Sequence, residues 1–590
     1  MYPQVHLCTF RLARSAGKLL LFPFILVLLS CQEEIDYPDI EKHQVIISKD
    51  KAMYAPLEQI KLSIDIELPA TTRIRYRHLN EVIHESAYQG TAWVWQAPPG
   101  NYKGYMVELY SVENNREAIH ASIGIDVSTD WKKFPRYGYL SNFSNQANTN
   151  DVIENLNRHH INGILFFDWQ QKPHMPLPVS TGDPNQVWQS FANQAVSLKT
   201  LKNYITKAGN RNMTTFFHNF AYCVTSGAHY DGVAQSWHLF RDTNRSERDI
   251  QNLPKPPFAN DLYVMNPASL GWQQYIRQKN HEIFAALNFD GWHIDQLGDR
   301  GNVYDFNGNV VPLATDFKPF LDYIKDDNPS SRLICNALNQ FGQYAIAHSP
   351  VDVLYTEVEP PHETFSDLSR IIINNNSFSN NTRQSVLAAF INSERGRRPE
   401  YFNTPTVLFT NAVIFAFGGS RMELGEHMAS NKYLPDLSYQ MNNELKGSLL
   451  NYYDFLVAYQ NLLRDGGVFN KPSIVVANRA CCTSHWPPIK DNIAVVGKNF
   501  DTMQVVHMIN FLDVKSFSWQ NNTNDIPAPV RQNNLTIVHS TNRAVSKIWF
   551  ASPDVNHGSS SSLDYLQTDT EVVFTVPSLD YWSMFVIEYK

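Results

Sequence analysis

The feature that most restricts the fold is a series of short apolar runs that alternate with helical stretches between residues 129 and 470. Strands and helices that alternate in this way form a parallel sheet covered by helices. Eight runs fit the strand pattern: Tyr137–Ser141, Gly163–Trp169, Thr214–Asn219, Phe289–Asp295, Leu333–Asn336, Val351–Glu357, Ser385–Phe390 and Ser420–Leu424. Eight such units predict a (β/α)₈ barrel with long loops.

An open, doubly wound sheet is the structural alternative. Sheets of that type usually carry a glycine-rich phosphate loop after their first strand. No such loop follows the run Tyr137–Ser141. The pattern therefore favours the closed barrel.

Strand-like alternation appears on both sides of the barrel region. Between residues 45 and 128, the run Ile60–Ile66 alternates with a period of two, and Gly and Pro mark a turn near Pro99. This part predicts an immunoglobulin-like β-sandwich. Between residues 471 and 590, runs such as Met503–Ile509 predict a C-terminal antiparallel β-sandwich. The chain is thus expected to be multidomain, as its 590 residues also suggest.

The N-terminus has the pattern of a secretory signal over residues 1–30. Three basic residues precede the apolar run Leu19–Leu29, which is too short for a comfortable membrane span. The ending Leu28–Cys31 resembles a bacterial lipobox, in which the cysteine is lipidated after cleavage. The alternative is a plain signal peptide with an incidental cysteine.

Residues 31–44 are expected to form a tether. Its acidic start, Gln32–Glu34, resembles the surface-export signals of Bacteroidetes-type lipoproteins. We therefore expect a protein of the cell envelope, anchored in the outer membrane through a lipid on Cys31 and facing the cell surface.

Composition and residue spacing argue against several classes of function. The net charge of -8, without a basic cluster, argues against nucleic acid as a partner. The sequence has no Gly-x-Ser-x-Gly motif of a serine hydrolase. His159 and His160 are adjacent and cannot face one metal from a helix. The four cysteines beyond Cys31 have neither disulfide-framework nor zinc-site spacing: Cys223, Cys335, Cys481 and Cys482. We expect no metal and no cofactor.

Polar residues recur where the predicted strands end. They are Asp168 and Trp169, His218 and Asn219, Asp295, Asn336, Glu357, and Glu426 with His427. Each alone could cap a helix, occupy a turn or face solvent. In a barrel, however, the carboxyl ends of the strands converge on one pocket.

Two carboxylates on separate strands suit acetal hydrolysis. One attacks or stabilises the anomeric carbon, and the other, kept protonated, gives its proton to the leaving oxygen. Burial and the negative charge of the first group would raise the pKa of the second. The high aromatic content, 13%, fills cores but also supplies flat faces for sugar rings.

The segment Phe289–Asp299 resembles the nucleophile segment of glycoside hydrolase family 66. That family contains dextranases and cycloisomaltooligosaccharide glucanotransferases. The resemblance continues in Ile161–Trp169, Leu354–Glu357 and Glu423–Met428. It extends to both predicted β-domains, because the family has the same order of modules.

The resemblance implies a retaining enzyme acting on α-1,6-linked glucan, with Asp295 as nucleophile and Glu357 as general acid/base. Such a mechanism needs carboxyl groups roughly 5–5.5 Å apart and passes through a covalent glycosyl-enzyme. The residues expected to bind the sugar are Tyr139, Asp168, Trp169, Asn219 and Glu426.

The chain departs from the family pattern at Glu359. Many members have a Trp two residues after the acid/base. On a strand, Glu357 and Glu359 point to the same side, so Glu359 competes for the acid role. We prefer Glu357 because it lies in the matching Tyr-Thr-Glu context.

The leading functional hypothesis is an endo-dextranase that cuts dextran into isomaltooligosaccharides. A cyclising or transferring α-1,6-glucanotransferase is a related alternative. Cyclising members usually carry a carbohydrate-binding insertion, and the dozen or so residues between Phe390 and Thr404 leave no room for one. A non-catalytic surface glycan-binding lipoprotein is a third hypothesis. We expect a monomer whose β-domains brace the barrel, since their aromatic residues follow the alternation of cores.

Overall fold

A computed structural model describes residues 45–590, except for 114–115, 392–399, 433–438, 478–481 and 524. The predicted signal peptide, the tether and Cys31 lie outside the described residues, as do Cys481 and most of the segment between Phe390 and Thr404. Among the residues described, no helix has both the length and the apolar character needed to cross a membrane.

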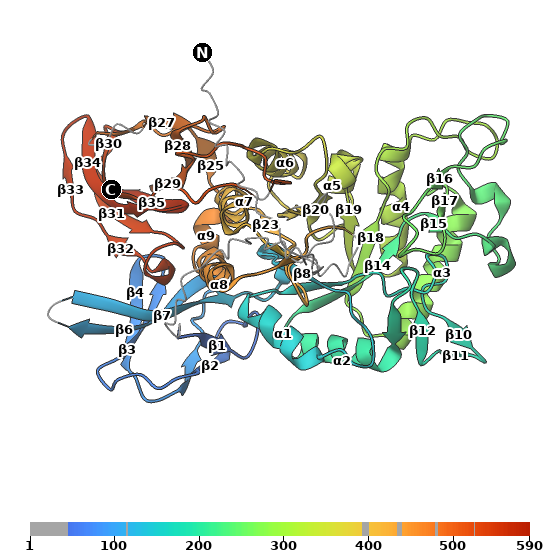
Figure 1. The fold of residues 1–590 in the computed structure, drawn as a ribbon, viewed down its shortest axis with the longest axis horizontal. Helices are drawn as coiled ribbons and strands as arrows, with labels where there is room; N and C mark the ends of the chain where they lie inside the picture. Colours follow the sequence, from blue (N-terminus) through green and yellow to red (C-terminus); the bar gives the residue numbers. More distant parts are fainter. Residues whose placement is uncertain (1–44, 114–115, 392–399, 433–438, 478–481, 524) are drawn as a thin grey trace, which may run out of the picture. The chain divides into compact units, whose positions relative to one another are not determined.

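Eight parallel strands form a nearly closed barrel (Figure 1). In chain order they are β8 (Tyr137–Leu140), β9 (Gly163–Phe166), β14 (Thr214–Phe220), β18 (Gly291–Asp295), β19 (Arg332–Asn336), β20 (Leu354–Glu357), β21 (Ser385–Ala388) and β23 (Ser420–Arg421). Neighbouring strands in this order are hydrogen-bonded in parallel. The backbone N–H of Tyr139 in β8 donates to the carbonyl of Leu424, just after β23, at 3.0 Å. The predicted eight-stranded parallel barrel is confirmed, with several strands shorter than the apolar runs.

Helices follow the strands along the chain. They are α1 (Thr149–Arg158), α2 (Leu198–Gly209), α3 (Leu270–Ala286), α4 (Leu313–Asp327), α5 (Gln343–Ala347), α6 (Phe365–Phe378), α7 (Thr404–Ala416), α8 (Asn443–Ala458) and α9 (Gln460–Leu463). Short polar side chains start several of them. Ser197 caps α2, and Thr364 forms a reciprocal capping box with Asp367 at the start of α6. These caps satisfy backbone N–H groups that the first helical turn leaves without partners.

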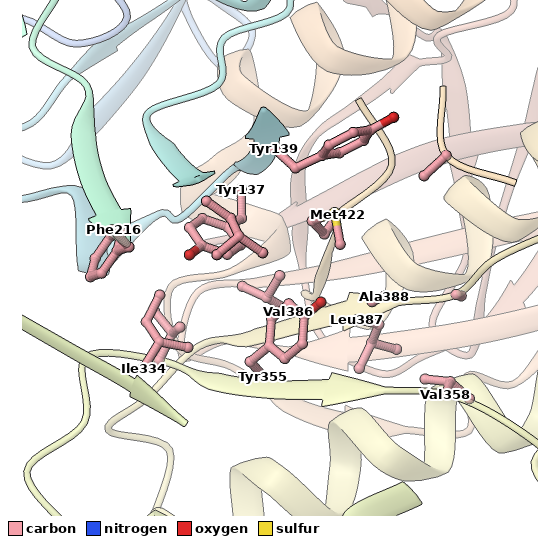
Figure 2. Packing of buried hydrophobic residues seen from close by; sticks show 14 of the residues in the cluster. Tyr137, Tyr139, Phe216, Ile334, Tyr355, Val358, Val386, Leu387, Ala388 and Met422 are labelled. Carbon is pink, nitrogen blue, oxygen red and sulfur yellow. The ribbon is translucent and has the colours of Figure 1, made fainter. Parts of the chain in front are cut away.

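The inside of the barrel is filled by side chains from successive strands. Figure 2 shows Tyr137, Phe216, Ile334 and Tyr355 grouped between the strands that carry them. The ring of Tyr137 meets those of Phe216 and Tyr355 edge-on and stacks on His293, with centroids about 6 Å apart. These side chains make the interior of the barrel a packed core rather than a pore.

Two antiparallel sheets precede the barrel. One has the order β1 (Ile47–Lys49), β2 (Gln59–Ile64), β5 (Ala92–Gln96), and the other β4 (Glu81–Ala87), β3 (Arg73–His78), β6 (Lys103–Glu113), β7 (Arg116–Val127). Leu62 of the first sheet and Val107 and Ile123 of the second share one buried apolar cluster. The alternation seen in Ile60–Ile66 therefore marks the buried face of β2.

The C-terminal part also contains two main sheets. The larger runs through β25 (Val468–Asn470), β28 (Asn492–Asn499), β29 (Met503–Asn510), β35 (Trp582–Tyr589), β31 (Val545–Ala551) and β32 (Ser561–Ser562), and the smaller through β26 (Ile474–Val476), β30 (Gln532–Ser540), β34 (Glu571–Leu579) and β33 (Tyr565–Gln567). Both contribute to one apolar cluster. One pairing departs from the expected antiparallel pattern, because β27 (Cys482–His485) pairs in parallel with β28.

Candidate active site

A cavity of about 290 Å³ opens at the carboxyl ends of the barrel strands. Its charged and polar lining comes from several of the strand ends singled out in the sequence: Asp168, His218, Asp295, Asn336, Glu357 and Glu359. Apolar side chains such as Phe191, Phe220 and Phe258 complete the wall. A concave, partly apolar site with a few convergent polar groups is the usual form of a small-ligand pocket.

Asp295 is the last residue of β18, and its side chain is 19% exposed. One carboxylate oxygen, Oδ1, accepts hydrogen bonds from Asn336 Nδ2 at 2.8 Å and from the backbone N–H of Gln296 at 2.9 Å. The other, Oδ2, lies 3.4 Å from His218 Nε2. Burial raises the pKa of Asp295, but the hydrogen bond and charge of His218, with the bond from Asn336, hold it below its ordinary value. Asp295 is thus kept ionised.

Glu357 is the last residue of β20 and contacts the same Asn336 amide as Asp295. Asn336 Nδ2 also donates to Glu357 Oε2 at 3.1 Å, and Asn336 Oδ1 accepts from the backbone N–H of Glu357 at 3.1 Å. Because one nitrogen contacts both carboxyl groups, the distance between Asp295 Oδ1 and Glu357 Oε2 cannot exceed the sum of 2.8 and 3.1 Å. Burial and the negative charge of Asp295 raise the pKa of Glu357 to about 8, despite the opposing charge of Lys432.

His218 lies between two carboxylates. Its Nδ1 is 3.4 Å from Asp168 Oδ1, opposite the nitrogen that faces Asp295. Asp168 is in the left-handed backbone region, with a φ of 50°, which is uncommon for residues other than glycine. Burial raises the pKa of Asp168 to about 6, although the charge of His218 lowers it. His218 therefore bridges the carboxylates of Asp168 and Asp295 along one side of the cavity.

Glu359 also reaches the cavity but has a different partner. Its carboxylate forms an ion pair with Lys432, and its backbone N–H donates to Asn339 Oδ1 at 2.8 Å. No bond joins it to Asn336 or Asp295 among the interactions of the described residues. Glu357, which shares the Asn336 amide with Asp295, is therefore the glutamate placed to act on the same bond as Asp295.

Four expected sugar-binding residues lie outside the cavity lining. Trp169 is fully buried, and its indole N–H donates to the carbonyl of His218 at 3.1 Å. Asn219 is also fully buried and donates to the carbonyl of Pro173. Both support the strands behind the cavity rather than line it.

Tyr139 and Glu426 hold the first and last strands of the barrel together. The Tyr139 hydroxyl donates to the carbonyl of His427 at 2.9 Å. Glu426 accepts from the backbone N–H groups of Ser141 and Asn142, each at 2.9 Å. Of the five expected sugar-binding residues, the structure brings only Asp168 into the cavity with the two carboxyl groups.

His218 and Asn336 have a larger part in the site than the sequence indicated. On β14 the alternation places Phe216, His218 and Phe220 on the inner face, and Asn219 on the outer face. The same rule places His293 and Asp295 inside on β18. Applying this period of two across the strand ends would have selected His218 over Asn219.

Among the described residues, no group of three or more His, Cys, Asp or Glu side chains is arranged so that it could hold a metal ion. Cys223 and Cys335 are buried thiols. Burial raises the pKa of both thiols, so neither is a ready nucleophile.

The sequence of this chain is similar to those of known carbohydrate-active enzymes. The family model of glycosyl hydrolase family 66 matches residues 49–586. A cycloisomaltooligosaccharide glucanotransferase from Niallia circulans is 23% identical, over 96% of this chain and 74% of that protein. A dextranase from Streptococcus salivarius is 21% identical, over 83% of this chain and 68% of that protein.

A solved structure shows the same fold. It is a cycloisomaltooligosaccharide glucanotransferase from Paenibacillus sp. in complex with cycloisomaltoheptaose, with a TM-score of 0.84 and 21% identity. The match covers 92% of this chain and 99% of the other. Since the family model spans nearly the whole described chain, this protein belongs to glycosyl hydrolase family 66.

Proposed function

We propose that this protein is a retaining endo-glycosidase that hydrolyses the α-1,6-glucosidic linkages of dextran to isomaltooligosaccharides. The observation that carries the proposal is the amide of Asn336, which hydrogen-bonds to Asp295 and Glu357 at once. The resulting spacing suits direct attack by one carboxylate on the bond that the other protonates, since retaining enzymes need roughly 5–5.5 Å. An inverting enzyme needs a wider gap, to hold a water molecule.

In the first step, an oxygen of Asp295 attacks the anomeric carbon while the glycosidic carbon–oxygen bond breaks. Glu357 gives its proton to the leaving oxygen, and the glycosyl group stays covalently attached to Asp295. In the second step, ionised Glu357 takes a proton from water, and that water displaces Asp295 from the anomeric carbon. Two inversions retain the α configuration.

The electrostatics of the cavity support this division of roles. His218 and Asn336 favour the ionised form of Asp295, as a nucleophile requires. Burial and Asp295 favour the protonated form of Glu357, as an acid requires. When the glycosyl group neutralises Asp295, the pKa of Glu357 falls, which suits its second role as a base.

A second candidate is transfer to a sugar hydroxyl, including cyclisation. The observation that favours it is the similarity of the chain to cycloisomaltooligosaccharide glucanotransferases. The same glycosyl-enzyme would form, and an acceptor hydroxyl would replace water in the second step. Both candidates therefore use the same two residues and differ in their products.

The deciding experiment is product analysis on dextran. Hydrolysis should release reducing ends and linear isomaltooligosaccharides, whereas cyclisation should give products without reducing ends. The proposal of dextran hydrolysis fails if purified protein releases no reducing ends from dextran but releases them from another glucan.

Two substitutions test the roles and the alternative of a non-catalytic glycan-binding protein. Asp295→Asn and Glu357→Gln should each lower kcat on dextran by at least about 10³-fold, because each removes a group that acts in the transition state. Asp316→Asn, a matched change on α4 outside the cavity, should leave kcat unchanged. A glycan-binding protein would show dextran affinity that Asp295→Asn does not alter and no turnover in any variant.

We further propose that the protein is a monomer whose flanking sheets, an N-terminal immunoglobulin-like unit and a C-terminal sandwich, brace the barrel, and that a lipid on Cys31 anchors it in the outer membrane. The proposal for the anchor rests on the lipobox-like ending at Cys31. In cells, Cys31→Ala should abolish incorporation of labelled palmitate and move the protein to the soluble fraction. Incorporation unchanged by this substitution would refute the anchor.

A further inference from the structure

We infer that the Glu359–Lys432 ion pair is an electrostatic positioning element that adjusts the proton affinity of Glu357 and hence the upper pH limit of activity. The inference rests on the proposed function, because it assumes that Glu357 supplies the proton. It assigns a role to two residues that take no direct part in the bond exchange.

The first observation is where the pair lies. Glu359 and Lys432 line the same cavity as Glu357 and Asp295. Glu359 follows Glu357 by two residues, directly after β20, and Lys432 comes from the segment after β23. The pair therefore joins two neighbouring parts of the cavity wall close to the acid.

The second observation is that Glu359 is held in place. Its backbone N–H donates to Asn339 Oδ1 at 2.8 Å, and Asn339 Nδ2 donates to the carbonyl of Pro360 at 3.0 Å. One side chain thus fixes the backbone on both sides of the Glu359 carboxylate. The side chains of Glu359 and Lys432 are 28% and 38% exposed, so solvent screens the pair only in part.

The electrostatic signs are opposite for the two members. A cation beside a carboxyl group stabilises its ionised form, and an anion destabilises that form. Lys432 accordingly lowers the pKa of Glu357, and Glu359 raises it. The two charges therefore act on the pKa of Glu357 in opposite directions, and their effects partly cancel while both are present.

Other groups around Glu357 do not give this balance. Asp295 raises the pKa of Glu357 and is the proposed nucleophile. The remaining ionisable side chains of the cavity lining are Asp168, His218, His293 and Tyr355. Lys432 is the one lysine or arginine in that lining among the described residues. The two charges of the ion pair can therefore be removed by substitution while both proposed reacting groups, Asp295 and Glu357, remain.

The test is the pH dependence of kcat/KM on dextran in Lys432→Met and Glu359→Gln. The decline of kcat/KM at high pH, the basic limb of the profile, reports loss of the Glu357 proton in the free enzyme. Removing the cation raises the pKa of Glu357, so the basic limb of Lys432→Met should move to higher pH by roughly half a unit or more. Removing the anion should move the limb of Glu359→Gln to lower pH by a similar amount. The double variant should lie between the two.

Two controls make the result specific. Lys318→Met breaks an exposed ion pair with Asp322 on α4 and should leave the limb in place. High salt should shrink both shifts, because it screens partly exposed charges. A stacking or purely structural role for the pair would lower kcat/KM without moving the limb in opposite directions.

Failure of the inference is distinguishable from failure of the proposed function. In one outcome, wild-type protein cleaves dextran, Glu357→Gln does not, and the basic limbs of Lys432→Met and Glu359→Gln coincide with that of the wild type. The inference is then wrong, and the proposed function stands. If Glu359→Gln abolishes turnover while Glu357→Gln retains it, Glu359 is the acid and both assignments fall.

Discussion

At the scale of single residues, Asn336 organises the site. It is the last residue of β19, and its side chain uses one nitrogen and one oxygen to contact Asp295 and Glu357. An amide can do this because it offers donors and an acceptor at once and carries no charge. A carboxylate in this place would face two other carboxyl groups and supply no donor while ionised.

The substitution Asn336→Asp tests this role with almost no change in shape. It removes the donor to Asp295 and adds a negative charge, which should raise the pKa of both Asp295 and Glu357. We expect kcat/KM on dextran to fall by about 10²–10³-fold, with the acidic limb of the pH profile moved to higher pH. A profile identical to that of the wild type would show that Asn336 does not organise the pair.

At the scale of elements, β18 and β19 must lie close together for Asp295 and Asn336 to meet. The two strands pair in parallel, with Gly291 opposite Arg332. A Cβ at Gly291 would lie 2.3 Å from the carbonyl oxygen of Arg332, which is backbone and cannot move aside alone. The glycine at the start of β18 therefore permits the close approach of the two strands that carry Asp295 and Asn336.

Gly291→Ala should consequently reduce both stability and activity. Overpacking of this kind costs about 1–3 kcal/mol, and any separation of the strands lengthens the Asp295–Asn336 bond. The measurement is the free energy of unfolding together with kcat/KM on dextran. Gly209→Ala is the matched control, since a Cβ at Gly209, the last residue of α2, would meet nothing within 4 Å. Equal tolerance of both substitutions would contradict the argument.

At the scale of the whole molecule, α8 connects the barrel to the sheet that precedes it. Asp454 of α8 is 1% exposed and accepts hydrogen bonds from Arg158 at 2.8 Å and from the backbone N–H of Gly124 in β7 at 3.0 Å. His160 Nε2 lies 2.6 Å from the same carboxylate. The N-terminal sheet is thus joined to the barrel through a buried charge.

Asp454→Asn tests how much this connection stabilises the protein. Leaving Arg158 without its buried counter-charge should lower the free energy of unfolding at pH 7 by about 3 kcal/mol. Burial raises the pKa of Asp454, but Arg158 and His160 outweigh it and hold the pKa well below its ordinary value. The stabilisation is therefore complete above the unfolded pKa, near 4, and is lost as pH falls further.

The difference between wild type and Asp454→Asn should accordingly shrink below about pH 4. Denaturation at pH 7 and at pH 3.5 would measure it. The control is Asp322→Asn, which removes an exposed partner of Lys318 and should change stability by less than about 1 kcal/mol. A difference that grows on acidification would contradict the assignment.

Much of this organisation was predictable from local patterns. The alternation of apolar runs and helices determined the eight strands, because each pattern reports how one segment meets water. Asp295 and Glu357 could be predicted as a catalytic pair because each ends such a run. Parallel strands bring their carboxyl ends together. A resemblance to family 66 marked the same residues.

Side-chain environment was decided only by the tertiary structure. Trp169 and Asn219 are the sequence neighbours of Asp168 and His218, yet they lie outside the cavity lining and are buried behind it. Tyr139 and Glu426 join the ends of the sheet. No local pattern reports these outcomes, because they depend on which strands become neighbours and on which face each strand presents. The Asn336 amide contacts both carboxyl groups only because β18, β19 and β20, which helices separate in the sequence, are adjacent in the barrel.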